Sequence, residues 1–148
     1  MKSWLAKKKL FFSYLRHTKS KLARIYPSKR ANQLNFIPAL LWAVLIFILS
    51  TGHSVQVPRF SNLLEPDKLA HTAAYFVMAA LLLWGFHRTI GVTSATMTGA
   101  IVISSLYGIS MECVQYTFFP NRFFEVYDII ANIIGSILGV LGLNFLIK

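Results

Sequence analysis

The 148-residue chain has little charge for its length and only one cysteine. Asp, Glu, Lys and Arg make up 14% of its residues, against roughly 25% in an average soluble domain. Hydrophobic residues make up 55%, which argues against a soluble globular protein. The lone thiol, Cys113, cannot form an internal disulfide, so a small secreted scaffold held by disulfides is excluded. One thiol is also too few for a cysteine-based zinc ribbon.

Acidic residues are absent from residues 1–30, although this segment holds ten of the fifteen Lys and Arg residues. The rest of the chain has equal numbers of acidic and basic residues. A basic block directly before an apolar body is typical of a cytoplasmic segment that is attracted to anionic lipid head groups. We therefore expect this arm to contact the membrane surface, and we expect no nucleic acid partner.

Within this arm, apolar residues recur at spacings of seven and four. They are Trp4, Phe11, Leu15, Leu22 and Tyr26. Most basic residues lie off this stripe, as in an amphipathic helix that lies in the membrane interface. Lys8 fits this amphipathic pattern only if its ammonium reaches back to the membrane interface. The alternative is that the whole arm is a disordered basic tail. We define residues 1–35 as a basic cytoplasmic arm and residues 36–148 as a transmembrane domain.

Four apolar stretches follow the arm. Their lengths are close to the roughly 17 to 25 residues that a transmembrane helix needs. They are residues 36–52, 69–86, 92–116 and 129–147. The first reaches the lower limit only when Ser50, Thr51 and Gly52 extend it. The pattern predicts an all-α integral membrane bundle of four transmembrane helices.

The placement of Lys and Arg predicts the orientation of this bundle. With the N-terminus inside, twelve basic residues lie on the cytoplasmic side, and only Arg59, Lys68 and Arg122 lie outside. The opposite orientation would carry the ten charges of the arm across the bilayer. We expect a multi-pass protein of the cytoplasmic membrane with both termini in the cytoplasm.

All five acidic residues fall at helix ends that this topology places on the outer side. They are Glu65 and Asp67, Glu112, and Glu125 and Asp128. Carboxylates in or beside lipid are costly, so they usually face the bundle interior and mark function. Glu112 lies about one turn inside its apolar stretch and needs a partner, for which we expect His71, Lys68 or Arg122.

Other polar residues share helix faces with these carboxylates. The sets are Asp67, His71 and Tyr75 with Lys68 beside them, Glu112 with Gln115, and Asp128 with Asn132. The last face continues as Gly135 and Gly139, a spacing of small residues that indicates close helix packing.

In this order, the polar residues resemble the pattern of the VanZ-like membrane proteins. The similar segments are Leu49-Ser50-Thr51, Asp67-Lys68-Leu69-Ala70-His71 with Tyr75, Glu112-Cys113-Val114-Gln115, and Arg122, Asp128, Asn132, Gly135 and Gly139. The resemblance covers residues 37–142 and leaves out the arm. Asn121 stands where the family usually has Gly, and Asn tolerates a left-handed turn. The resemblance implies a small helical envelope protein whose namesake is linked to low-level resistance to the glycopeptide antibiotic teicoplanin. It implies no biochemical activity, and resistance does not carry over from one relative.

Three functions of different classes are open. The first, which we favour, is an outward-facing site that binds or modulates an envelope lipid or lipid-linked precursor. Lys68 and Arg122 would meet phosphate, and the amides of Gln115 and Asn132 would meet sugar or peptide groups, with Asp67 and Tyr75 completing the ligand-binding set. The second is a hydrolase or transferase that acts on a lipid head group, and the third is a structural ion network that only stabilises the bundle.

The enzyme alternative needs catalytic groups from three helix ends. His71 would act as general base, and Glu112 or Asp128 would orient it or act as acid. No Ser or Cys nucleophile is placed convincingly. A metal variant would use His71, Glu112 and Asp128. One His with two carboxylates is a weak zinc signature, so we assign no metal ligand and expect no cofactor.

Overall fold

The computed structural model describes residues 33–51, 65–119 and 124–148. The chain divides into two compact units, Met1–Leu34 and Asn35–Lys148. The second unit contains α3 (Ile37–Thr51), α4 (Pro66–Thr89), α5 (Ser94–Phe118) and α6 (Val126–Leu146). The described residues contain no strand, which confirms the predicted all-α class. The helix predicted for the basic arm lies almost entirely outside the described residues, so this helix and the boundary at residue 35 stay predictions.

Three of these helices are long and apolar enough to cross a membrane. They are α4, α5 and α6, with 24, 25 and 21 residues. α3 has 15 residues and is therefore roughly 22 Å long at about 1.5 Å per residue, less than the ~30 Å hydrocarbon core. The first predicted span is thus shorter than expected, because its helix ends at Thr51. The chain is a helical membrane protein, and its described residues include three helices of spanning length.

The boundaries of α4 and α5 follow from local chemistry. α4 begins at Pro66, three residues before the predicted start, so Asp67 and Lys68 lie in its first turn. Proline is tolerated there because the first backbone N–H groups of a helix have no partner within the helix. α5 begins after a capping box in which Thr93 and Thr96 each bind the other's backbone N–H. These boundaries bring the polar residues of α4 into a regular helix.

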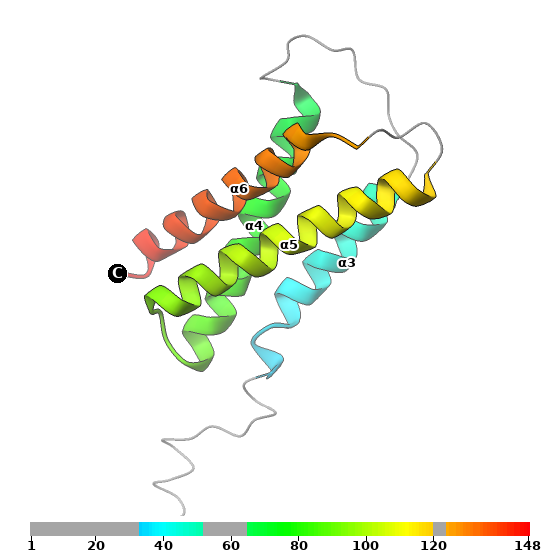
Figure 1. Ribbon diagram of the computed structural model, residues 1–148. Coiled ribbons are helices and arrows are strands. Elements are labelled where there is room, and N and C mark those ends of the chain that lie inside the picture. Colours follow the sequence, from blue (N-terminus) through cyan, green and yellow to red (C-terminus); the bar gives the residue numbers. More distant parts are fainter. Residues whose placement is uncertain (1–32, 52–64, 120–123) are drawn as a thin grey trace, which may run out of the picture. The chain divides into compact units, whose positions relative to one another are not determined.

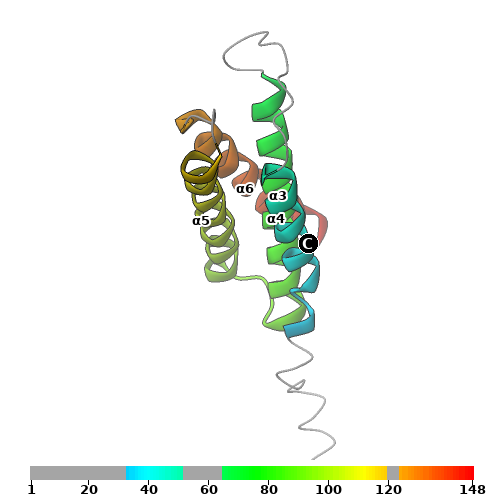
Figure 2. The ribbon, with the colours of Figure 1, turned by 90° about the vertical axis from the view of Figure 1, so that its right-hand side faces the viewer.

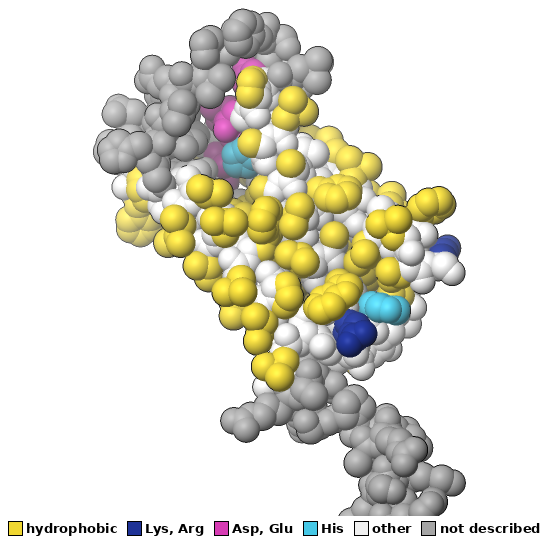
Figure 3. All heavy atoms as spheres, turned by 180° about the vertical axis from the view of Figure 1, so that it is seen from behind, with side chains coloured by type: hydrophobic (Ala, Val, Ile, Leu, Met, Phe, Trp, Pro, Cys, Tyr) yellow, Lys and Arg dark blue, Asp and Glu magenta, His cyan; other side chains and the backbone are white. Residues whose placement is uncertain are grey.

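The surface of the bundle is apolar and much of its interior is polar. Figure 3 shows apolar side chains covering the middle of one face. Large apolar residues of all four helices are exposed, whereas several polar residues are buried. The buried polar residues are Thr96, Ser104, Glu112, Gln115, Asp128, Asn132 and Ser136. This distribution is expected for helices surrounded by lipid, because polar groups in a bilayer must find their partners inside the protein.

α4 and α6 pack closely through the small residues of α6. A Cβ atom at Gly135 would overlap the carbonyl oxygen of Thr72, and one at Gly139 would overlap that of Phe76. The missing side chains therefore let the two backbones touch, as the spacing of the glycines predicts. This contact sets the separation of the two helices that carry most of the polar residues.

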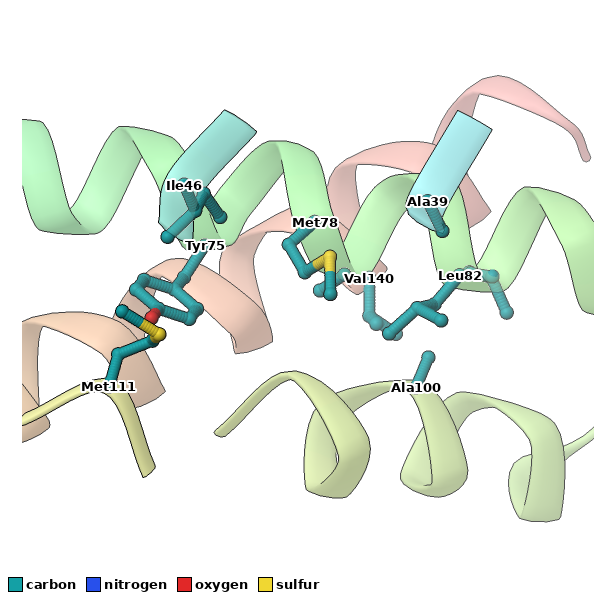
Figure 4. Packing of buried hydrophobic residues seen from close by; sticks show 10 residues of the cluster. Ala39, Ile46, Tyr75, Met78, Leu82, Ala100, Met111 and Val140 are labelled. Atoms are coloured by element: carbon teal, nitrogen blue, oxygen red, sulfur yellow. The ribbon is translucent and has the colours of Figure 1, made fainter. Parts of the chain in front are cut away.

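A compact apolar cluster lies between the helices (Figure 4). It joins Ile46 of α3, Met78 of α4, Ala100 of α5 and Val140 of α6. Hydrogen bonds add to this packing at α3: Trp42 Nε1 donates to the carbonyl of Ala74 at 2.9 Å, and the Tyr107 hydroxyl donates to the carbonyl of Ala43 at 2.7 Å. The first hydrogen bond thus joins α3 to α4, and the second joins α3 to α5.

Candidate functional site

The polar residues of the bundle gather at one end. Because successive helices run in opposite directions, the last turns of α3 and α5 lie at the same end as the first turns of α4 and α6 (Figures 1 and 2). All five acidic residues of the chain belong to this end, and Figure 3 shows acidic side chains beside a histidine there. We refer to it as the acidic end.

Lys68 is the centre of an ion-pair network at the acidic end. Its Nζ lies 3.2 Å from Glu65 Oε2, 2.9 Å from Glu125 Oε2 and 2.9 Å from Asp128 Oδ1. An ammonium has three hydrogens, so each can bind one of these carboxylates. Lys68 therefore neutralises groups of its own chain, and it would have to leave them to bind a ligand phosphate.

His71 lies one turn along α4 from Asp67, and each of its ring nitrogens faces a different environment. Nδ1 lies 3.0 Å from Asn132 Oδ1. Nε2 lies 4.0 Å from Asp67 Oδ1 and 3.9 Å from Asp128 Oδ2, too far for hydrogen bonds. The structure thus brings four predicted site residues together, with Asn132 as the group that orients the ring.

Glu112 is 3% exposed, and the partner that the structure shows for it is a backbone group. Its Oε1 accepts the backbone N–H of Glu125 at 2.9 Å, rather than a side chain of His71 or Lys68. The third candidate, Arg122, lies outside the described residues. Glu112 meets this N–H because Glu125 directly precedes α6, and the first N–H groups of a helix have no partner within the helix.

Gln115 and Tyr75 lie deeper in the bundle, between α3, α4 and α5. The Gln115 side chain donates from Nε2 to the carbonyl of Ser50 at 3.0 Å, which ties α5 to the last turn of α3. Tyr75 is 2% exposed, and its ring lies 6.4 Å from that of Tyr107. Both residues form part of the wall of a pocket.

This pocket has a volume of about 210 Å³ and opens at the acidic end. Its wall changes from apolar to polar over a short distance. It is lined by Ile46, Leu49, Ser50, Asp67, Ala70, His71, Ala74, Tyr75 and Gln115. The pocket therefore joins apolar side chains of α3 to the ionisable groups of α4.

The sequence matches the family model of VanZ/LLP1 over residues 10–147. The chain belongs to the VanZ/LLP1 family. The match corrects the extent that we inferred from the motifs, because it includes much of the basic arm, which we had placed outside the resemblance. No curated protein and no solved structure matches the chain. Family membership makes the chain a VanZ-like membrane protein of the cell envelope.

The VanZ motifs converge in space at the acidic end. Asp67, Lys68 and His71 of the first motif meet Asp128 and Asn132 of the last, whereas Glu112 of the middle motif supports the start of α6. The paired glycines of the family pattern make this convergence possible, because they bring α6 against α4.

Three residues of the site were absent from the set predicted by sequence. Glu65 and Glu125 bind Lys68, and the carbonyl of Ser50 binds Gln115. The spacing of Glu65 and Lys68, three residues apart at a helix start, is a signal that could have identified the first. A backbone carbonyl on another helix leaves no signal in the sequence.

Below His71, a row of buried polar groups continues between α5 and α6. Ser136 Oγ lies 2.8 Å from both Ser104 Oγ and the carbonyl oxygen of Asn132, and it can donate its one hydrogen to either of them. Asn132 Nδ2 finds no hydrogen-bond acceptor among the described residues, and it lies where a Cβ at Gly108 would be 2.8 Å away. Gly108 thus provides the space that the amide of Asn132 needs.

Proposed function

We propose that the acidic end is an outward-facing site that binds or modulates an envelope lipid or a lipid-linked precursor. The supporting observation is the pocket, whose lining joins apolar residues such as Ile46 and Leu49 to the polar groups of Asp67, His71 and Gln115. A lipid presents the same two chemistries within one molecule, since an acyl chain adjoins a polar head group. Binding sites are usually apolar clefts with a few polar groups that orient the ligand.

The charge of the site favours particular parts of a head group. Five carboxylates and one ammonium belong to the described residues at the acidic end. Such a set attracts the hydroxyl and amide donors of a sugar or peptide more strongly than it attracts phosphate. Asp67 has a side chain that is 52% exposed, so it can accept such donors directly. Arg122 remains the predicted partner for phosphate.

The orientation of the site is part of the proposal. Twelve basic residues on the side of the termini against three on the other side favour an orientation in which the acidic end lies outside the cytoplasmic membrane. An envelope precursor that is displayed on the outer leaflet would then reach the pocket without crossing the bilayer. Reduced sensitivity to teicoplanin, as reported for the family's namesake, is one phenotype that such binding would produce.

A structural role is the second candidate, and one observation favours it. Lys68 has carboxylate partners for all of its ammonium hydrogens, and two of them come from α6 or the residue before it. A network that joins α4 to α6 in this way would stabilise the bundle even without a ligand. The lipid-binding function requires an open pocket, whereas the structural role does not.

Filling the pocket separates them. We would extract the protein in a mild detergent, measure bound lipid by native mass spectrometry, and repeat the measurement with Ala70→Phe. Ala70 lines the pocket, whereas Ala73 is exposed elsewhere on α4, so Ala73→Phe adds the same ring outside it. We expect Ala70→Phe to lose bound lipid and Ala73→Phe to retain it, with both as stable as the parent. Equal lipid retention by the two variants would contradict the lipid site.

A further inference from the structure

We propose that Asp67, His71 and Asp128 form a binding site for a divalent transition-metal ion, with Zn²⁺ as the ion of closest fit. One ligand atom of each residue lies within 4.8 Å of the other two. Two of the residues are one turn apart on α4, and the third comes from the first turn of α6. The set differs from the one that the sequence suggested, because Glu112 binds a backbone N–H and Asp67 takes its place.

The amide of Asn132 orients the imidazole of His71 in a way that suits a metal ligand. The oxygen of the Asn132 amide can only accept a hydrogen bond, so the contact at Nδ1 holds the hydrogen on that nitrogen. When the ring is neutral, the lone pair of Nε2 then points toward the two carboxylates. Ligand histidines in metal sites are commonly oriented in this way by a partner at the other ring nitrogen.

Asp128 supplies an independent observation that points to a cation. Its side chain is only 5% exposed, and Oδ1 binds the Lys68 ammonium. Oδ2 faces His71 Nε2 at 3.9 Å, too far for a hydrogen bond. A cation between these two atoms would be attracted strongly by a carboxylate that is largely removed from water. Lys68 does not occupy this position, because it binds the other oxygen.

The separations of the ligand atoms suit a small cation. Nε2 lies 4.0 Å and 3.9 Å from the two carboxylate oxygens, too far for hydrogen bonds. Two bonds of about 2.0–2.2 Å in tetrahedral geometry place ligand atoms roughly 3.4 Å apart, so small rotations of the side chains would complete the site. Asp67 is half exposed and free to make such a rotation. A mixture of imidazole and carboxylate ligands suits Zn²⁺ better than it suits Mg²⁺ or Ca²⁺.

The ion would also change what the pocket can bind. Asp67 and His71 both line the pocket, so an ion that they hold would lie at its wall with a coordination position left for a water or a ligand oxygen. A positive centre there would attract the phosphate of a head group, which the carboxylates alone repel. The metal site does not rest on lipid binding, since the two are measured separately.

The test uses the full-length protein in detergent and Zn²⁺ as the only added ligand. After treatment with a chelator, we would measure Zn²⁺ binding by equilibrium dialysis and elemental analysis. We expect one ion per chain, and a loss of affinity of at least tenfold in Asp67→Asn and in His71→Gln. The control is His87→Ala, at the other end of α4, which should bind Zn²⁺ like the parent.

Several outcomes would overturn the metal site. One is that the parent binds no Zn²⁺. Another is that the double variant Asp67→Asn/His71→Gln binds Zn²⁺ as tightly as the parent, which would place the ion elsewhere. Because Asp67 is half exposed and has no Lys or Arg partner among the described residues, Asp67→Asn should fold like the parent, and its thermal aggregation checks this. A protein that retains lipid but binds no Zn²⁺ would overturn the metal site alone. One that binds Zn²⁺ but never lipid would overturn only the proposed function.

Discussion

The ammonium of Lys68 and the carboxylate of Asp128 lie 2.9 Å apart and join the first turn of α4 to the first turn of α6. Asp128 is 3% exposed, so this contact is a buried ion pair. The same carboxylate directs its second oxygen toward His71. One residue thus connects the stability of the bundle to the group that we expect to act on a ligand.

Removal of the lysine should destabilise the protein. In Lys68→Met, the buried carboxylate of Asp128 loses its cation, a change that typically costs about 3–5 kcal/mol. We expect a clear fall in the thermal aggregation temperature in detergent. Lys148→Met is the control, because Lys148 is exposed at the C-terminus. Equal temperatures for both variants would show that the network adds nothing to stability.

The glycines of α6 should tolerate no side chain. Gly135→Leu places a Cβ against the carbonyl oxygen of Thr72, so α6 must move away from α4. We expect a loss of about 3 kcal/mol, at the upper end of the range for overpacking, together with loss of function.

The control for this substitution is Leu141→Ala on the same helix. Leu141 is 52% exposed on the apolar surface, so the change removes only lipid-facing atoms. It should leave both thermal aggregation and function near those of the parent. If Gly135→Leu behaved in the same way, the contact between α4 and α6 would not hold the site together.

Glu112 offers a substitution that separates charge from structure. Glu112→Gln keeps an oxygen that can accept the N–H of Glu125, whereas Glu112→Ala leaves that donor without a partner. We expect Glu112→Gln to be nearly as stable as the parent, and Glu112→Ala to lose about 1–3 kcal/mol. The measurements are thermal aggregation and lipid retention.

The two readouts for Glu112→Gln lead to different conclusions. A stable variant that no longer retains lipid, or loses any activity that is found, would assign the carboxylate a functional role. A variant that is stable and unaltered in lipid retention and activity would show that Glu112 only supports the start of α6.

The predicted orientation can be tested with reporters. A reporter that is active only in the cytoplasm should be active when it is fused after Lys148, because both termini are expected inside. It should be silent when inserted between Val55 and Phe60, in the segment that we place outside. Reversed signals would put the acidic end in the cytoplasm and remove the argument for a ligand of the outer leaflet.

The sequence alone determined the helical class, the apolar spans and the helix ends at which the polar residues lie. These features depend on local patterns: the length of apolar runs, and the spacing of four that puts Asp67 and His71 on one face. The paired glycines also indicated close packing before their partner helix was known. For the same reason, the motifs were sufficient to identify the family.

Only the tertiary structure decided which of these residues meet. The spacing within a helix fixes the face that a side chain shares, but not the rotation and offset of one helix relative to another. The contact of Gly135 and Gly139 with the backbone of α4 sets both. It therefore places Lys68 among three carboxylates, puts Asn132 against His71, and leaves Glu112 with a backbone N–H as its partner.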